Sequence, residues 1–106
     1  MHKLVIHAPH YRTVASRKDF TTIFSSGLAT GYAINRLLHL KVKSGMKVIL
    51  LRKDKGKARA EGVLSAISAS ILPTANGVLR YDLEIADFKK VNYRSETLNR
   101  NGVNVI

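Results

Sequence analysis

Apolar and polar residues alternate with a period of two along much of the second half of the chain. The alternation is clearest over residues 79–88, where two sets of side chains take turns: Leu79, Tyr81, Leu83 and Ile85 against Arg80, Asp82 and Glu84. Successive side chains of a β-strand point to opposite faces of the sheet, so this stretch predicts a half-buried strand. Residues 46–51 and 59–69 also alternate, and the first stretch is apolar in both phases. We therefore expect a mostly antiparallel sheet whose strand at 46–51 is buried on both faces.

Turn-forming residues separate these predicted strands. Residues 53–57 read Lys-Asp-Lys-Gly-Lys, and residues 73–77 run from a proline to a glycine. Asp, Gly and Pro suit the backbone of tight turns, so the first segment is predicted to be a hairpin tip and the second a turn. Val91 and Tyr93 are expected to extend the preceding strand past a bulge. Residues 103–106 suit either a final edge strand or an unpacked tail.

A short strand and a helix are predicted near the N-terminus. Residues 4–7 form an apolar run, which we expect to be a central strand. Ser16 stands three residues before Asp19, just ahead of an apolar stretch, in the capping-box pattern that opens a helix. Gly27 is expected to end this helix.

A second helix is predicted from about Gly31 or Tyr32 to Leu40, with Thr30 as its cap. An apolar stripe along it supports the prediction: Ile34, Leu37 and Leu38. A strand and two helices followed by a sheet indicate a small α+β domain. We expect it to span residues 1–106 and to form a partly closed barrel.

The chain is strongly basic, with 18 Lys and Arg against 7 Asp and Glu and a formal net charge of +11. Such a charge attracts polyanions, which makes nucleic acid or an anionic membrane surface a candidate partner. Neither predicted helix combines a basic face with a broad apolar face, so we expect no membrane binding. The 106 residues include no Cys, which excludes disulfides, thiolate zinc sites and a Cys nucleophile. The chain shows no signal-peptide pattern, and we expect a cytoplasmic protein.

Two stretches of the chain match short motifs of a known superfamily. Residues 42–50 read Val-Lys-Ser-Gly-Met-Lys-Val-Ile-Leu, and residues 61–63 read Glu-Gly-Val. They are similar to a K-x-G-D-x-v-x-l turn and strand followed by a v-G-x-g-x-v strand, with Met46 where Asp is usual. The chain thereby resembles the PUA-like superfamily, especially its EVE and ASCH branches. The resemblance implies a pseudobarrel that binds RNA or reads a modified base in DNA. Its binding cleft would lie between the first helical region and the sheet.

Residues 26–36 are similar to the ASCH stretch S-G-x-K-T-x-E-x-R. Ser26, Gly27 and Thr30 match it in register, whereas Ala29 takes the Lys position and Tyr32 the Glu position. Those Lys and Glu positions carry the hydrolytic chemistry in the family members that are amidohydrolases. We therefore expect no catalytic residues in this chain and a binding protein rather than an enzyme.

Lysine and arginine side chains cluster around the predicted hairpin. The ones expected to contact a phosphate backbone are Lys43, Lys47, Arg52, Lys53, Lys55, Lys57 and Arg59. Each such contact releases a condensed counterion and so favours binding at low salt. The alternative for each side chain is a solvated hairpin position, because Lys-rich tips also protect sheet edges.

A second set of residues suits the recognition of an exposed base. We expect Tyr11, Tyr32 and Arg36 to line a cleft, with Arg12 beside it and His10 bonded to a base or phosphate. Aromatic rings and guanidinium groups stack on unpaired or flipped bases. The alternative is that Tyr32 packs into the core and Arg36 is a solvated helix residue.

Two other pairs of residues have the spacing of a metal site or of an acid and base pair, but the surrounding sequence supports neither role. His7 and His10 have metal-ligand spacing, but no third ligand follows nearby. Asp82 and Glu84 share a strand face with Arg80, which indicates surface ion pairs rather than an acid and base pair. We expect neither a metal nor a cofactor.

The leading hypothesis is a nucleic-acid-binding module that favours RNA over DNA. One alternative is a small nucleic-acid-processing enzyme, amidohydrolase-like or RNase-like, that uses His10, Tyr32 and Arg36. Another is an accessory or inhibitory protein that binds an acidic protein surface.

Overall fold

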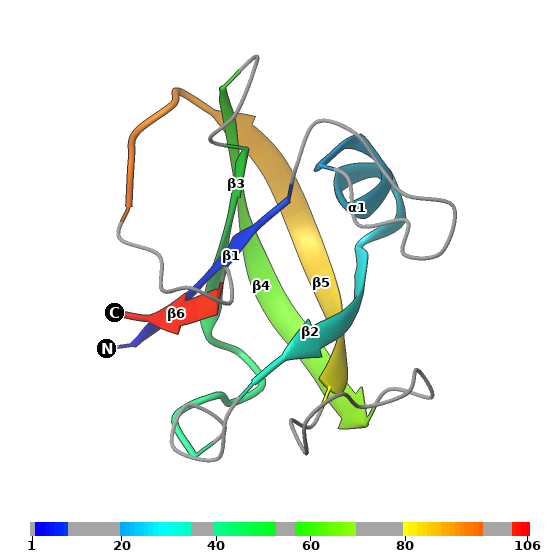
Figure 1. Ribbon diagram of the computed structural model, residues 1–106. Helices are drawn as coiled ribbons and strands as arrows, with labels where there is room; N and C mark the ends of the chain where they lie inside the picture. Colours follow the sequence, from blue (N-terminus) through cyan, green and yellow to red (C-terminus); the bar gives the residue numbers. More distant parts are fainter. Residues whose placement is uncertain (1, 9–19, 35–39, 53–56, 70–79, 97–102) are drawn as a thin grey trace.

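The computed structural model describes residues 2–8, 20–34, 40–52, 57–69, 80–96 and 103–106. These residues form one helix and six strands (Figure 1): β1 (Lys3–His7), α1 (Phe20–Ser26), β2 (Leu28–Ala33), β3 (Lys47–Arg52), β4 (Ala58–Ala69), β5 (Arg80–Val91) and β6 (Val103–Val105). No helix in this part of the chain is long and apolar enough to cross a membrane.

All six strands belong to one mixed sheet with the order β2-β5-β4-β3-β1-β6. β1 and β3 are parallel, and the other neighbouring strands are antiparallel. The predicted strands at residues 4–7, 46–51, 59–69 and 79–88 correspond to β1, β3, β4 and β5. β1 lies between β3 and β6, so it is an interior strand as predicted, although it is next to the edge strand β6 and not at the centre of the sheet.

The predicted fold class is wrong on two points. The described residues are mostly β rather than α+β. Their sheet is also open, because β2 and β6 stand at its two edges and do not pair with each other, so it is not a closed pseudobarrel (Figure 1). Part of the segment predicted to be the second helix instead forms β2, which pairs with β5. This pairing is the physical reason for the lower helix content.

The second predicted helix is wrong over its first residues and its cap. Thr30 lies inside β2, and this strand pairs with β5 with Ala29 opposite Leu83 and Tyr32 opposite Tyr81. Thr and Tyr pack well on a pleated surface, and the ladder to β5 pairs the backbone groups of β2. Residues 35–39 of the predicted helix lie outside the described residues.

The first predicted helix is confirmed as α1, and it ends at Gly27 as expected. Gly27 has a positive φ of 70°, and its N–H donates to the carbonyl of Ile23 at 2.8 Å. Glycine adopts this left-handed conformation without the steric penalty of a Cβ. The capping residues Ser16 and Asp19 lie outside the described residues.

The sheet buries apolar side chains on both of its faces. The face that packs against α1 is here called the inner face, and its main strand residues are Leu4, Ile6, Val48, Leu50, Leu64, Leu83 and Ile85. The opposite or outer face carries a smaller cluster of Val5, Ile49 and Leu51, against which Tyr93 packs. Alternate residues of β3 belong to the two clusters, so burial of this strand on both faces is confirmed.

The end of β5 and the C-terminus settle two further expectations. β5 continues to Val91 past a register shift in its pairing with β4, and Asp87 near that shift has a positive φ of 58°. Tyr93 lies beyond the strand and packs on the outer face. β6 pairs antiparallel with β1, so the C-terminal residues form an edge strand and not an unpacked tail.

Candidate nucleic-acid interface

The structure removes Tyr32 from the predicted base-binding cleft. Its side chain is buried, with only 4% exposed, and its hydroxyl donates to the carbonyl of His7 at 3.0 Å. Burial raises the pKa of the Tyr32 hydroxyl above its ordinary value, so it stays protonated and acts as a donor. The ring is therefore part of the inner core and joins β2 to the end of β1.

The other members of the predicted cleft and two members of the basic hairpin lie outside the described residues: His10, Tyr11, Arg12, Arg36, Lys53 and Lys55. Arg52 is half-buried at the end of β3, whereas Lys43, Lys47 and Lys57 are exposed. These three lysines remain candidates for phosphate contact.

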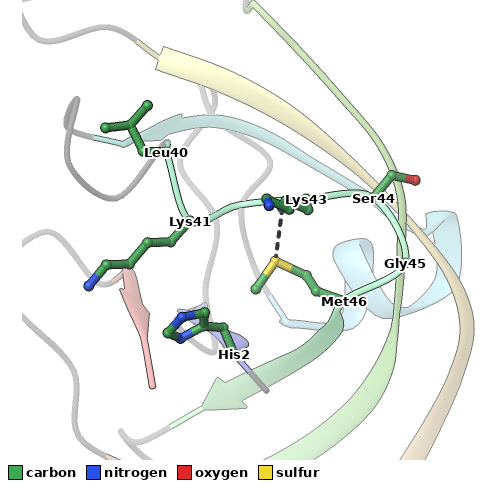
Figure 2. Close-up of a pocket in the computed structure, with 7 residues that line it drawn as sticks. All are labelled: His2, Leu40, Lys41, Lys43, Ser44, Gly45 and Met46. Carbon is green, nitrogen blue, oxygen red and sulfur yellow. Dashed lines mark hydrogen bonds between the residues drawn. The ribbon is translucent and has the colours of Figure 1, made fainter.

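Lys43 lines a pocket of about 400 Å³ at the turn that leads into β3 (Figure 2). This Met46 pocket is formed by His2, Leu40, Lys41, Lys43, Ser44, Gly45 and Met46. The Lys43 N–H donates to the Met46 sulfur at 3.3 Å, and the Gly45 N–H donates to the carbonyl of Leu64 at 2.7 Å. The bond to Leu64 holds the turn against β4, so the pocket is built on a turn that is fixed to the folded sheet.

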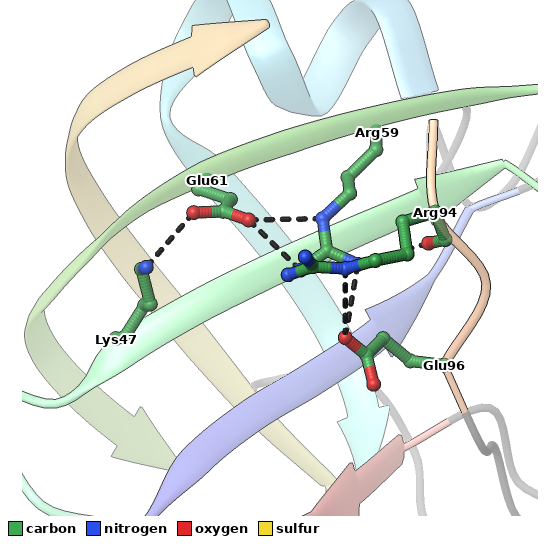
Figure 3. Close-up of polar contacts among 5 residues, drawn as sticks. All are labelled: Lys47, Arg59, Glu61, Arg94 and Glu96. Carbon is green, nitrogen blue, oxygen red and sulfur yellow. Dashed lines mark hydrogen bonds and ion pairs between the residues drawn. The ribbon is translucent and has the colours of Figure 1, made fainter. Parts of the chain in front are cut away.

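Arg59 is the second residue of β4 and lies on the outer face, where its side chain is buried, with 1% exposed (Figure 3). Its Nε donates to Glu61 Oε2 at 2.9 Å, and its Nη2 lies 2.8 Å from the same oxygen. Its Nη1 donates to the Arg94 carbonyl at 2.9 Å and to Glu96 Oε1 at 3.0 Å. The guanidinium thus ties β4 to residues 92–96, which follow β5.

The burial of Arg59 takes it out of the predicted phosphate-binding set. Each of its three guanidinium nitrogens already has a carboxylate or carbonyl partner, and a buried cation needs such partners to offset lost hydration. The two carboxylates beside it, Glu61 and Glu96, in turn have this buried guanidinium as their cationic partner. Arg59 is therefore a structural residue that shapes the charge of the outer face.

Lys47 adds a second cation to this network. Its Nζ lies 2.9 Å from Glu61 Oε1, and its side chain remains 46% exposed. The hydrogen bond from Lys47, followed by the one from Arg59, holds the pKa of the Glu61 carboxyl below its ordinary value, although partial burial opposes the shift. Glu61 is thus ionised in the folded protein over a wider range of pH than in the unfolded chain.

The lowered pKa of Glu61 makes stability fall in acid. A carboxyl with a depressed pKa in the folded state stabilises the fold fully above its unfolded pKa, near 4.5, and this contribution is lost as pH falls through the folded value. We expect the free energy of unfolding to drop between about pH 6 and about pH 3, and to drop less in Glu61→Gln. Urea denaturation of both proteins at the two pH values measures this; an equal drop would contradict the assignment.

Sheet register places further cations around Arg59. Lys3 on β1 lies opposite Lys47 on β3, and Lys89 on β5 lies opposite Glu61 on β4. Paired residues on neighbouring strands point to the same face, so all of these side chains belong to the outer face. We define the basic patch as five cations around Arg59 at its end of the outer face: Lys3, Lys47, Lys57, Lys89 and Arg94.

Two members of the basic patch are placed by residues 92–96. Lys57 Nζ lies 5.7 Å from the centre of the Tyr93 ring, within the range of a cation–π contact. The Arg94 side chain is 72% exposed, and its Nε lies 4.0 Å from Glu96 Oε1. Farther along β5 the same face carries Arg80, Asp82 and Glu84, so acidic side chains outnumber basic ones at that end of the strand.

The sequence alone did not indicate Lys3, Lys89, Arg94 or the role of Glu96. The alternation of side chains along a strand places Lys89 and Lys90 on opposite faces of the sheet. Only the register between β4 and β5 shows that Lys89 is the residue opposite Glu61. Within the ranges that the structure describes, no group of three or more His, Cys, Asp or Glu side chains is arranged to hold a metal.

The chain was compared with protein-family models, curated proteins and solved structures. No family model, no curated protein and no solved structure matches it.

Proposed function

We propose that the protein is a nucleic-acid-binding module whose basic patch contacts the phosphate backbone. The observation that carries this proposal is the arrangement around Arg59. Both carboxylates within the patch, Glu61 and Glu96, are bonded to this buried cation, while Lys57, Lys89 and Arg94 stand exposed around them. The outer face therefore presents excess positive charge to a polyanion, in a chain whose formal net charge is already +11.

The patch suits backbone contact more than base reading. Lys and Arg neutralise phosphates without regard to sequence, and the energy comes largely from released counterions. Exposed apolar side chains lie among the cations: Val63 is opposite Lys47, and Val91 is opposite Arg59. These apolar positions give sugars and bases a surface to pack on beside the phosphate contacts.

RNA is our preferred polymer, and the cytoplasm our preferred location. The preference for RNA follows from the similarity of residues 42–50 and 61–63 to EVE and ASCH domains. The preference for the cytoplasm follows from the lack of cysteine, since a reducing compartment requires none of the disulfides that secreted small domains use.

The neighbouring lysines of β5 offer a matched test. Lys89→Glu and Lys90→Glu change the net charge equally, but Lys89 belongs to the basic patch whereas Lys90 lies over the rings of Phe20 and Phe24, at 5.9 and 6.0 Å. Fluorescence anisotropy with labelled single- and double-stranded RNA and DNA at several salt concentrations measures binding. We expect Lys89→Glu to weaken binding about tenfold and to reduce the salt slope by about one, with a clearly smaller effect of Lys90→Glu.

Equal weakening by the two substitutions would mean that overall charge, and not the outer face, governs binding. A wild-type Kd weaker than about 10⁻⁴ M for every polymer near physiological salt would reject nucleic-acid binding, because ordinary non-specific binding is tighter. The search would then turn to an acidic protein surface. Thermal melting of each variant checks that the fold is retained.

A further inference from the structure

We propose that the Met46 pocket binds a nucleoside monophosphate, with the phosphate on Lys41 and Lys43 and the base against Met46 and Leu40. This inference rests on the proposed function, because it assigns a nucleotide site beside the basic patch. The ligand is a nucleoside phosphomonoester, either free in solution or at the end of a strand.

The charge of the pocket suits a phosphate. Lys41 and Lys43 are both exposed at its rim, His2 lies on its wall, and none of the seven lining residues is acidic (Figure 2). An ammonium group binds phosphate as a compact point charge through short, charge-assisted hydrogen bonds. Two lysines two residues apart thus provide two donors for one dianionic group.

The apolar part of the pocket suits a flat ring. Met46 is nearly buried and presents a polarisable thioether, which makes favourable contacts with aromatic rings. Leu40 is 71% exposed, more than any other large apolar side chain in the described residues. A base seated between them would cover that exposed surface. The volume of about 400 Å³ is within the range of small-molecule sites, roughly 300 to 1,000 Å³.

The pocket lies at the end of the sheet where β1 and β3 begin, next to two members of the basic patch along the chain. His2 directly precedes Lys3 in β1, and Met46 directly precedes Lys47 in β3. Lys3 and Lys47 are opposite each other on these two parallel strands. Met46 packs in the inner cluster whereas Lys47 points to the outer face, so a strand with its phosphates over the basic patch reaches the pocket by passing around this end of the sheet.

Titration of the protein with AMP, adenosine and inorganic phosphate, followed by amide NMR, tests the pocket directly. We expect AMP to shift the amides of His2 and residues 40–46, and to bind more tightly than either fragment. Leu40→Ser should weaken AMP binding but not phosphate binding, whereas Lys41→Gln or Lys43→Gln should weaken both by about tenfold. Lys57→Gln, in the basic patch but outside the pocket, is the matched control and should leave AMP binding unchanged.

A second comparison identifies the source of the ligand. Tighter binding of 5′-phosphorylated than of 5′-hydroxyl RNA, with the difference lost in Lys43→Gln, would place a strand end in the pocket. AMP binding without that difference would indicate a free nucleotide. The inference is overturned if millimolar AMP leaves these amides unshifted or if adenosine binds as well as AMP. Strand binding that still depends on Lys89 in that case would leave the proposed function intact.

Discussion

Replacing Arg59 with methionine should lower the free energy of unfolding by about 3 kcal/mol. The substitution leaves the Glu61 and Glu96 carboxylates without their shared cation, and it removes the hydrogen bond from the guanidinium to the Arg94 carbonyl. Losing one member of a buried ionic network typically costs about 3 to 5 kcal/mol. The lower end applies here, because the carboxylates are 19% and 21% exposed and recover part of their hydration.

Chemical denaturation of three variants separates charge from packing. Arg59→Lys keeps the charge but cannot form the forked contacts to two carboxylates, so it should destabilise the fold less than Arg59→Met. Adding Glu61→Gln and Glu96→Gln to Arg59→Met removes the unpaired charges and should restore part of the lost stability. The account of the network would be wrong if Arg59→Met were as stable as the wild type, or if the triple variant recovered nothing.

Replacing Gly27 with alanine should destabilise the protein by about 3 kcal/mol. Gly27 has a φ of 70°, and a Cβ built on it would stand 2.7 Å from the backbone carbonyl oxygen of Ile85. The left-handed conformation costs about 1 to 2 kcal/mol for an L-residue, and the close oxygen adds strain because it belongs to the main chain of β5. The Ile85 N–H also donates to the Gly27 carbonyl at 2.7 Å, so the two backbones cannot separate without losing a bond.

Gly45→Ala is the matched control for this prediction. Gly45 also has a positive φ, at 93°, but nothing lies within 4 Å of the position that its Cβ would take. Only backbone strain remains there, and we expect a loss of about 1 to 2 kcal/mol. Urea denaturation of both variants measures the difference. Equal losses would show that the contact with Ile85 adds nothing to the conformational strain.

The strands could be predicted from the sequence because their signals are local. A period of two is a direct consequence of the pleat, and turn residues mark where each run stops. β3, β4 and β5 follow these signals, as does the end of α1 at Gly27, where the local backbone requires glycine. The segment from Leu28 to Ala33 has no such clear signal, and the helix predicted from Gly31 or Tyr32 rests on an apolar stripe that lies beyond this segment: Ile34, Leu37 and Leu38. Its pairing with β5, about fifty residues farther along the chain, decided the outcome.

The sequence by itself determined β1, β3, β4 and β5, the basic charge and the lack of cysteine chemistry, because these depend on composition and on neighbouring residues. Tertiary structure alone decided which cations face solvent. Arg59 and Lys57 are indistinguishable in a basic hairpin, yet Arg59 is buried through Glu96, which is 37 residues away, whereas Lys57 stays exposed. Burial of a charge depends on partners that the fold brings together, and strand register across the whole sheet sets those partners. The basic patch and the Met46 pocket are products of that register.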